Sequence, residues 1–96
     1  MVGFRICDNK GFHITFSNKV TVSVQFGPGN YCENYDESFN NQRVGGTKSS
    51  DAEIAIWKEG GEWITKEYPE FDADVVGNIT PDTLLKVLNW AKKYGI

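Results

Sequence analysis

Apolar and polar residues alternate over the first 26 positions, which is the pattern of β-strands that bury only one face. Residues 8–10 and 17–19 have turn-forming composition and divide this region into three segments. If both loops hold three residues, apolar side chains oppose apolar ones throughout and share one face of a sheet. Those side chains belong to Val2, Phe4, Ile6, Phe12, Ile14, Phe16, Val20, Val22 and Val24. The pattern predicts a three-stranded antiparallel meander in which Phe4, Ile14 and Val22 lie side by side and buried.

The opposite face of this meander carries Arg5, His13 and Ser23 in one row. An arginine beside a histidine would suit an anion or a phosphate group, whereas a solvated polar face is the simpler interpretation. A single histidine without a nearby Asp, Glu or Cys on its face predicts neither a metal site nor a catalytic triad.

The pattern of residues 52–66 predicts a second hairpin with residues 59–61 in its loop. Gly61 supplies the third residue that such a loop favours, because glycine tolerates positive φ. This register places Trp57 opposite Trp63 and leaves apolar groups on both faces of the hairpin. We expect a neighbouring loop to cover the two tryptophans; if they are exposed, they mark a binding surface.

The clearest helical pattern begins at Thr80, which can cap the first turn. Pro81 fits the first helical position, and Asp82 complements the helix dipole. Apolar residues then recur at helical spacing until Gly95, a natural stop. The chain therefore predicts a helix over residues 80–94 that packs on the apolar face of the sheet.

These elements predict one α+β domain over residues 1–96, with an antiparallel sheet of about five strands. One C-terminal helix, residues 80–94, packs on one face. The meander takes residues 1–26, a loop region takes residues 27–51, and the second hairpin takes residues 52–66.

The loop region is the longest stretch without a strand or helix pattern, and such loops are commonly functional. Its glycine-bounded start is either a strand-ending turn or a rigid recognition loop, and its acidic part is either solvated or a contact surface. The candidate partner-binding residues supply backbone freedom, an aromatic ring or a carboxylate: Gly27, Gly29, Asn30, Tyr31, Glu33, Tyr35, Asp36 and Glu37. The alternative ligand-binding residues are Arg5, His13, Trp57 and Trp63.

Composition narrows the function further. Ten Lys and Arg residues against 13 Asp and Glu residues give a net charge of −3, which argues against a generic binder of duplex nucleic acid. Two cysteines, Cys7 and Cys32, predict reduced thiols in a cytoplasmic protein, with a single bridge as the alternative. We expect no signal peptide, no membrane span, no metal and no cofactor.

Three stretches of the chain resemble a family of small, mostly uncharacterised proteins of phages and bacterial mobile elements: GFHITFSNKVTVSVQFGPGNYC, DAEIAIWKEGGEW and VVGNITPDTLLKVLNWA. The likeness covers most of the chain outside residues 33–51 and contains no catalytic motif, so it assigns no site residue. Small phage proteins of this size often block host defence, including CRISPR systems. The resemblance therefore implies an inhibitor of a bacterial defence protein, an anti-CRISPR protein being one form, in the host cytoplasm.

We accordingly expect a non-enzymatic protein whose acidic surface competes with nucleic acid for a basic site on a host defence protein. The alternative is a binder or sponge of a small nucleotide signal, which requires Arg5, His13 or lysines to converge with Tyr31 on one pocket. A small enzyme is disfavoured because paired acid–base groups are missing. An acidic patch would favour the inhibitor, and a basic, aromatic-lined pocket, especially at a subunit interface, would favour the nucleotide binder.

Overall fold

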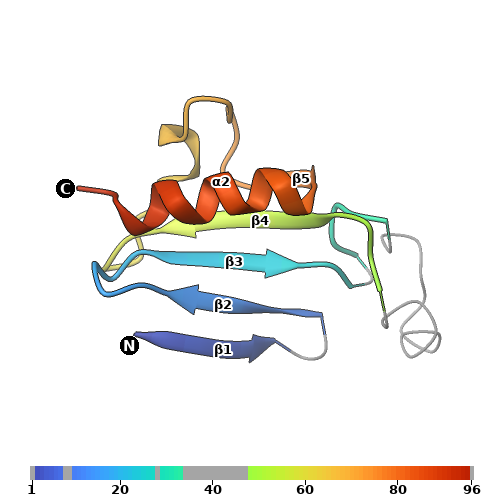
Figure 1. The fold of residues 1–96 in the computed structure, drawn as a ribbon, viewed down its shortest axis with the longest axis horizontal. Coiled ribbons are helices and arrows are strands. Elements are labelled where there is room, and N and C mark those ends of the chain that lie inside the picture. The colour runs from blue at the N-terminus through green and yellow to red at the C-terminus, as the bar shows by residue number, and fades with distance from the viewer. Residues whose placement is uncertain (1, 8–9, 28, 34–47, 96) are drawn as a thin grey trace.

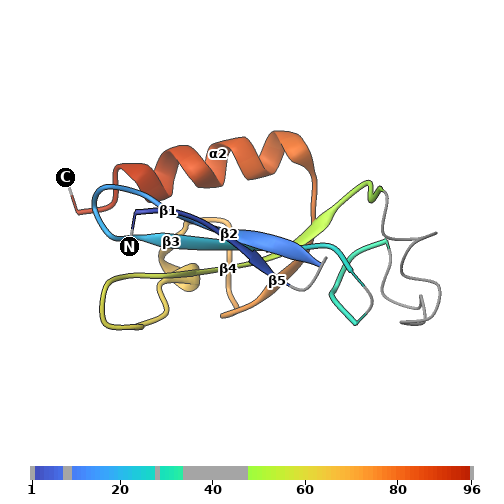
Figure 2. The same cartoon turned by 90° about the horizontal axis from the view of Figure 1, so that it is seen from below.

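A computed structural model describes residues 2–7, 10–27, 29–33 and 48–95 of the chain. In these residues five strands form one antiparallel sheet in the order β1-β2-β3-β4-β5, and helix α2 lies across one face (Figures 1 and 2). The elements are β1 (Gly3–Cys7), β2 (Gly11–Thr15), β3 (Thr21–Gln25), β4 (Ala52–Trp57), the 3₁₀ turn η2 (Thr65–Glu67), β5 (Val76–Ile79) and α2 (Pro81–Lys92). The predicted α+β class, with about five strands and one C-terminal helix, is confirmed.

The meander has the predicted register. Phe4 pairs with Ile14, and Ile14 pairs with Val22, so the two three-residue loops place these side chains in one row. The second loop closes with the Phe16 amide donating to the Val20 carbonyl at 3.0 Å. Lys19 takes the left-handed position of this loop with φ of 69°, a conformation that glycine or asparagine adopts more readily.

The core lies between α2 and the half of the sheet formed by β3, β4 and β5. Val22 and Ile56 are fully buried on the sheet, and Val87 and Ala91 are fully buried on the helix. The helix runs along β4 in Figure 1, so β1 and much of β2 extend beyond its cover. This half-covered arrangement decides which of the predicted core residues are buried.

The predicted burial of β1 is wrong. Phe4 is 70% exposed and Ile6 is 82% exposed, while Val2, just before the strand, is 52% exposed. Alternation correctly assigns these side chains to the apolar face, but the helix does not reach the edge strand. Ile14, on the next strand, is half-buried.

The second hairpin is confirmed only near its loop. Trp57 pairs with Trp63, and the Lys58 amide donates to the Glu62 carbonyl at 2.9 Å. The chain then turns into η2, and the fifth strand of the sheet is β5, which lies between the predicted hairpin and the predicted helix. Where η2 begins, the buried Thr65 hydroxyl accepts a hydrogen bond from the Ile56 amide at 2.9 Å. This bond replaces the one that a paired strand would provide.

Helix α2 begins as predicted, since the Thr80 hydroxyl accepts from the Thr83 amide at 3.3 Å. Its C-terminal end is held by a contact that the sequence pattern did not predict. The Asn18 side-chain amide donates to the carbonyls of Ala91 at 2.8 Å and Lys92 at 3.1 Å, which lie 73 and 74 positions further along the chain. Within the described ranges, no helix has the length and apolar character needed to span a bilayer.

Candidate functional site

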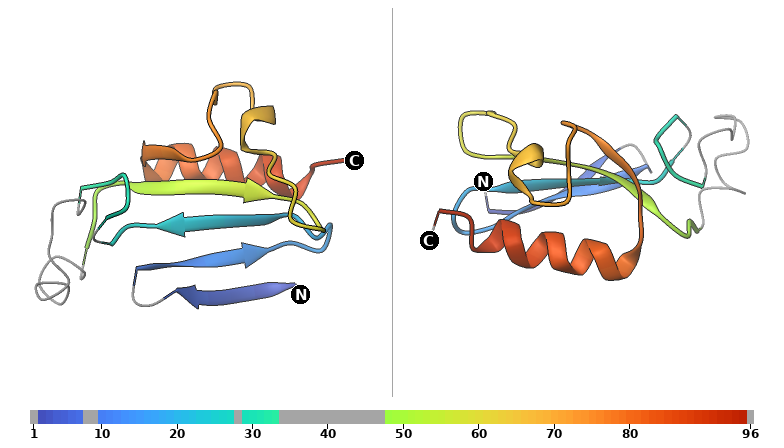
Figure 3. Two further views of the ribbon diagram at one scale, coloured as in Figure 1. Left: turned by 180° about the vertical axis from the view of Figure 1, so that it is seen from behind. Right: turned by 90° about the horizontal axis from the view of Figure 1, so that it is seen from above.

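The face of the sheet opposite α2 carries the predicted polar row. Strand pairing places Arg5 beside His13 and His13 beside Ser23, and Ala55 of β4 continues the row. Figure 3 shows this face from behind, with α2 on the far side of the sheet. The row is therefore available to a ligand over the strands that no described helix covers.

A chain of ring contacts crosses this face. The His13 and Trp57 rings meet edge to face with centroids 5.0 Å apart, and the Trp57 and Trp63 rings follow at 5.7 Å. Trp57 lies opposite Thr21, and His13 lies opposite Ser23, so the strand between β2 and β4 carries small side chains at this point. Thr21 and Ser23 are buried on a face that no described helix covers, and the adjoining rings account for this burial.

The expected cover over the tryptophans is absent for one of them. Trp57 is half-buried, but 48% of Trp63 is exposed. Trp63 thus belongs to the surface of the described part of the chain, which corrects, for this residue, the prediction that a loop covers both tryptophans.

A depression of about 270 Å³ lies on this face next to β1. Its lining residues are Gly3, Phe4, Arg5, His13, Thr15, Thr21 and Trp57. Three of the four residues predicted as an alternative ligand site therefore meet in one place, and Trp63 adjoins them through the Trp57 ring. Sequence alone missed the two threonines, whose hydroxyls are hydrogen-bonded to each other at 2.8 Å.

The charges of the depression favour an anion. Burial lowers the pKa of His13 below its ordinary value of 6.5, and the Arg5 charge lowers it further. His13 is therefore neutral at pH 7 and offers one donor and one acceptor nitrogen. Arg5 is exposed and forms no ion pair with any other described residue, so it supplies the positive charge of this face.

The glycine-bounded turn after β3 is held rigidly. The Glu53 carboxylate accepts from the Tyr31 amide at 2.9 Å and from the Asn30 side-chain amide at 3.3 Å. Asn30 in turn accepts from the Gly27 amide at 3.1 Å. Asn30 and Gly27 are buried, so they shape the turn from inside and do not present their own surface.

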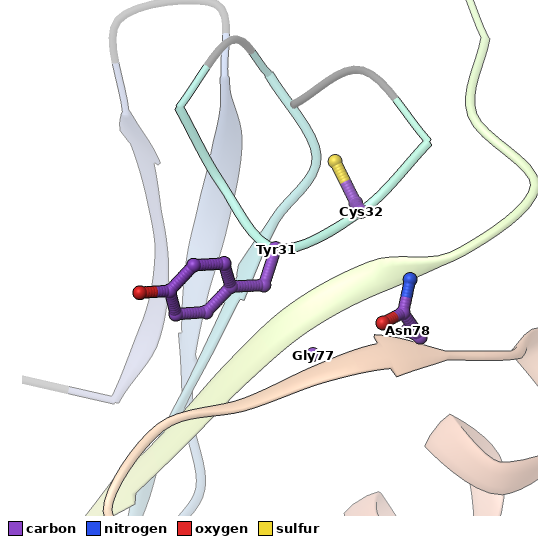
Figure 4. Close-up of a pocket in the computed structure, with 4 residues that line it drawn as sticks. All are labelled: Tyr31, Cys32, Gly77 and Asn78. Atoms are coloured by element: carbon purple, nitrogen blue, oxygen red, sulfur yellow. The ribbon is translucent and has the colours of Figure 1, made fainter. Parts of the chain in front are cut away.

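Tyr31 is the exposed side chain of this turn, with 56% of its surface accessible. It lines a shallow hollow with Cys32, Gly77 and Asn78, and its ring points away from the Cys32 and Asn78 side chains (Figure 4). A Cβ atom on Gly77 would collide with the Tyr31 Cβ and lie 2.7 Å from the Tyr31 carbonyl oxygen. Gly77 therefore allows β5 to approach the turn, a role that its place in the sequence did not suggest.

The two described acidic residues at the ends of the loop region, Glu33 and Asp51, hydrogen-bond to each other's segments. The Asp51 carboxylate accepts from the Glu33 amide at 2.7 Å and from the Asn78 side chain at 3.0 Å. The Glu33 carboxylate accepts from the Ser50 amide at 2.6 Å. Glu33 and Gly29 are exposed.

Three predicted partner-binding residues, Tyr35, Asp36 and Glu37, lie outside the described residues.

The two candidate sites are separate. Tyr31 does not line the depression beside Arg5 and His13, so the convergence with Tyr31 that we required of a nucleotide site is not found; Arg5 and His13 lie beside Trp57 instead. Within the described residues, no group of three or more His, Cys, Asp or Glu side chains is arranged to hold a metal ion.

Comparison with known proteins adds no functional assignment. No protein-family model matches the chain, and neither a curated protein nor a solved structure shows significant similarity to it.

Proposed function

We propose that this chain is a non-catalytic binding protein whose open sheet face binds a small anionic ligand with a planar ring, of the nucleotide class. The observation that carries the proposal is the meeting of Arg5, His13 and Trp57 in one depression, with Trp63 adjoining. Such a protein would act by sequestering its ligand.

Each group has a distinct part in this binding. Arg5 would form charge-assisted hydrogen bonds with a phosphate, which are stronger than bonds between neutral groups. The exposed face of Trp63 would stack on the ring of the ligand, an interaction worth about 1–3 kcal/mol per base. Neutral His13 would donate one hydrogen bond without bringing a charge. The depression, at about 270 Å³, is close to the lower limit of about 300 Å³ for ligand pockets, which suits a mononucleotide.

The test is a titration with adenosine 5′-monophosphate, followed by tryptophan fluorescence and by calorimetry. Separate titrations with adenosine and with inorganic phosphate measure how much the ring and the anion each contribute to the binding free energy. Arg5→Gln should weaken binding about tenfold or more, equivalent to the loss of one charge-assisted bond at about 1.5–3 kcal/mol. Trp63→Ala should weaken binding of adenosine and of the nucleotide, but not of phosphate.

Lys86→Gln is the matched control, because it removes one exposed positive charge from α2. The proposal fails if the nucleotide produces no heat and no fluorescence change at millimolar concentration. It also fails if Lys86→Gln weakens binding as much as Arg5→Gln does.

A second candidate function, inhibition of a host defence protein, rests on Tyr31. The ring is exposed on a turn that Glu53 fixes at two points, and rigid aromatic anchors commonly dominate protein interfaces. In a pull-down from bacterial lysate, Tyr31→Ala should lose a specific partner that Tyr31→Phe retains. If wild type, Tyr31→Ala and Tyr31→Phe capture the partner equally, Tyr31 does not contribute to the interface.

A further inference from the structure

The outer edge of β1 offers unused backbone hydrogen bonds. The Phe16 amide donates to the Val20 carbonyl, and the Phe26 amide donates to the Lys10 carbonyl. The backbone N–H and C=O groups of even-numbered residues in and around β2 therefore point toward β3. Because the direction of the backbone hydrogen bonds alternates along an antiparallel strand, the backbone groups of odd-numbered residues in β2 point toward β1. Their partners Gly3, Arg5 and Cys7 therefore point inward, and the backbone groups of Phe4 and Ile6 point away from the sheet.

This edge has little of the usual protection against pairing. Exposed edge strands commonly carry a proline, a bulge, charged side chains or a covering segment. The charged residue among the described residues of β1 is Arg5, which belongs to the row on the face opposite α2. The described residues of β1 have no proline and pair with β2 without a bulge, and no described segment pairs with the outer side (Figures 1 and 3). The apolar side chains of Val2, Phe4 and Ile6 are all more than half exposed. Pairing with another strand would therefore satisfy the outward backbone groups and bury the apolar side chains of this edge.

We propose that the partner is a second copy of this chain, with the two β1 strands paired antiparallel about a two-fold axis at Phe4. Phe4 of one copy then lies opposite Phe4 of the other, and Val2 lies opposite Ile6. The outward amides and carbonyls of these residues are in phase to exchange hydrogen bonds. Every side-chain pair on the helix side of the joined sheet is apolar.

Charge selects this register over its neighbour. An axis at Arg5 would place the two Arg5 side chains directly opposite each other, and like charges in that position are destabilising. Within residues 2–7 it would also give two bonded pairs, whereas the axis at Phe4 gives three. The axis at Phe4 instead places each Arg5 opposite Gly3 of the other copy, where a Cβ atom would meet nothing within 4 Å.

The second copy would also complete the depression. Gly3 lines it, so the arginine opposite Gly3 would arrive from the other copy at the same site as Arg5 and His13. The two Arg5 side chains of the dimer, one from each copy, would then lie next to both depressions. This consequence deepens the proposed ligand site, whereas the dimer itself rests on the edge of β1 and requires no ligand.

The first test is sedimentation of the ligand-free chain over a wide range of concentration. We expect a dimer that dissociates on dilution, since a single short strand pair buries less area than a permanent interface. Phe4→Lys should be monomeric. Because Phe4 is largely exposed, this variant should keep its circular dichroism spectrum.

Leu85→Lys is the matched control, since Leu85 is 61% exposed on α2, away from the paired edge. It should remain dimeric. A wild-type chain that stays monomeric at every concentration overturns the proposal. So does a dimer that Leu85→Lys breaks or that Phe4→Lys leaves intact.

Cross-linking tests the register. In a Cys7→Ser background, with Cys32 buried, Phe4→Cys should form an intermolecular disulfide, because directly paired Cα atoms lie about 5.5 Å apart. Arg5→Cys should not, because its equivalents are offset by two residues and exceed the ~7 Å limit. The reverse result would reject the axis at Phe4. Neither assay contains a ligand, so failure of the dimer and failure of the nucleotide site are separately visible.

Discussion

Asn18 joins the loop between β2 and β3 to the end of α2, and its replacement by aspartate should be costly. The side-chain amide donates to the carbonyls of Ala91, Lys92 and Tyr94, at 2.8, 3.1 and 3.3 Å. Its oxygen accepts from the Val20 amide at 3.1 Å. Asn18→Asp keeps the shape and this last bond, but it turns a carboxylate toward three carbonyl oxygens.

The cost has two parts. An amide has two N–H groups, so about two net hydrogen bonds are lost, at about 1 kcal/mol each. A negative charge at a helix C-terminus costs about 0.3–1 kcal/mol more. Asn18→Asp should therefore lower the free energy of unfolding by about 2–3 kcal/mol at pH 7. Ser17→Asp is the control, because Ser17 is the exposed neighbour of Asn18. It adds the same charge and should lower the free energy of unfolding by less than about 0.5 kcal/mol.

The assay is urea denaturation at neutral and at acid pH. The carbonyls should raise the pKa of the introduced carboxyl above its unfolded-state value. Its penalty is then present above the folded-state pKa and shrinks as pH falls through it, because a protonated carboxyl can donate again. The deficit relative to wild type should thus narrow in acid. Equal losses for Asn18→Asp and Ser17→Asp, or a deficit independent of pH, would refute the role given to Asn18.

Three further predictions concern single side chains. Thr65→Val should cost about 1–3 kcal/mol in thermal melting, because the buried Ile56 amide loses its acceptor, and Thr65→Ser should recover most of the loss. Thr80→Ala should cost about 1 kcal/mol through the lost cap to Thr83, and an unchanged melting midpoint would mean that the cap contributes nothing. The lowered pKa of His13 means that the unfolded state binds the proton more readily, so stability should fall as pH drops from 6.5 toward the folded-state pKa. His13→Gln should remove that part of the acid dependence, and a titration curve identical to wild type would contradict the assignment.

The register of the meander could be predicted because alternation and loop length constrain each other. A slip of one residue moves every side chain to the other face, and three-residue loops select the observed pairing of Phe4, Ile14 and Val22. Burial could not be predicted in the same way. It depends on where α2 crosses the sheet, and no pattern within β1 records that position, so exposed Phe4 has the same alternation signal as buried Val22.

The candidate site was predictable only within each hairpin, where Trp57 also pairs with Trp63 as expected. The row of Arg5, His13 and Ser23 follows from local pairing, but the contact of His13 with Trp57 requires β4 to pair with β3. That pairing joins segments far apart in the chain. Similarly, β5 is a four-residue strand that contains Gly77 and Asn78, both poor strand formers, and tertiary contacts override their propensity.

The hydrogen bonds of Asn18 also bear on the order in which the chain folds. They join residues 73 positions apart, whereas the meander forms from neighbouring segments. Closing so long a loop costs entropy that later contacts must recover, so local strand pairs are favoured early and the helix end is fixed late. An interaction absent from the transition state affects the unfolding rate alone. The hydrogen bonds between Asn18 and the end of α2 should thus slow unfolding and leave the refolding rate nearly unchanged.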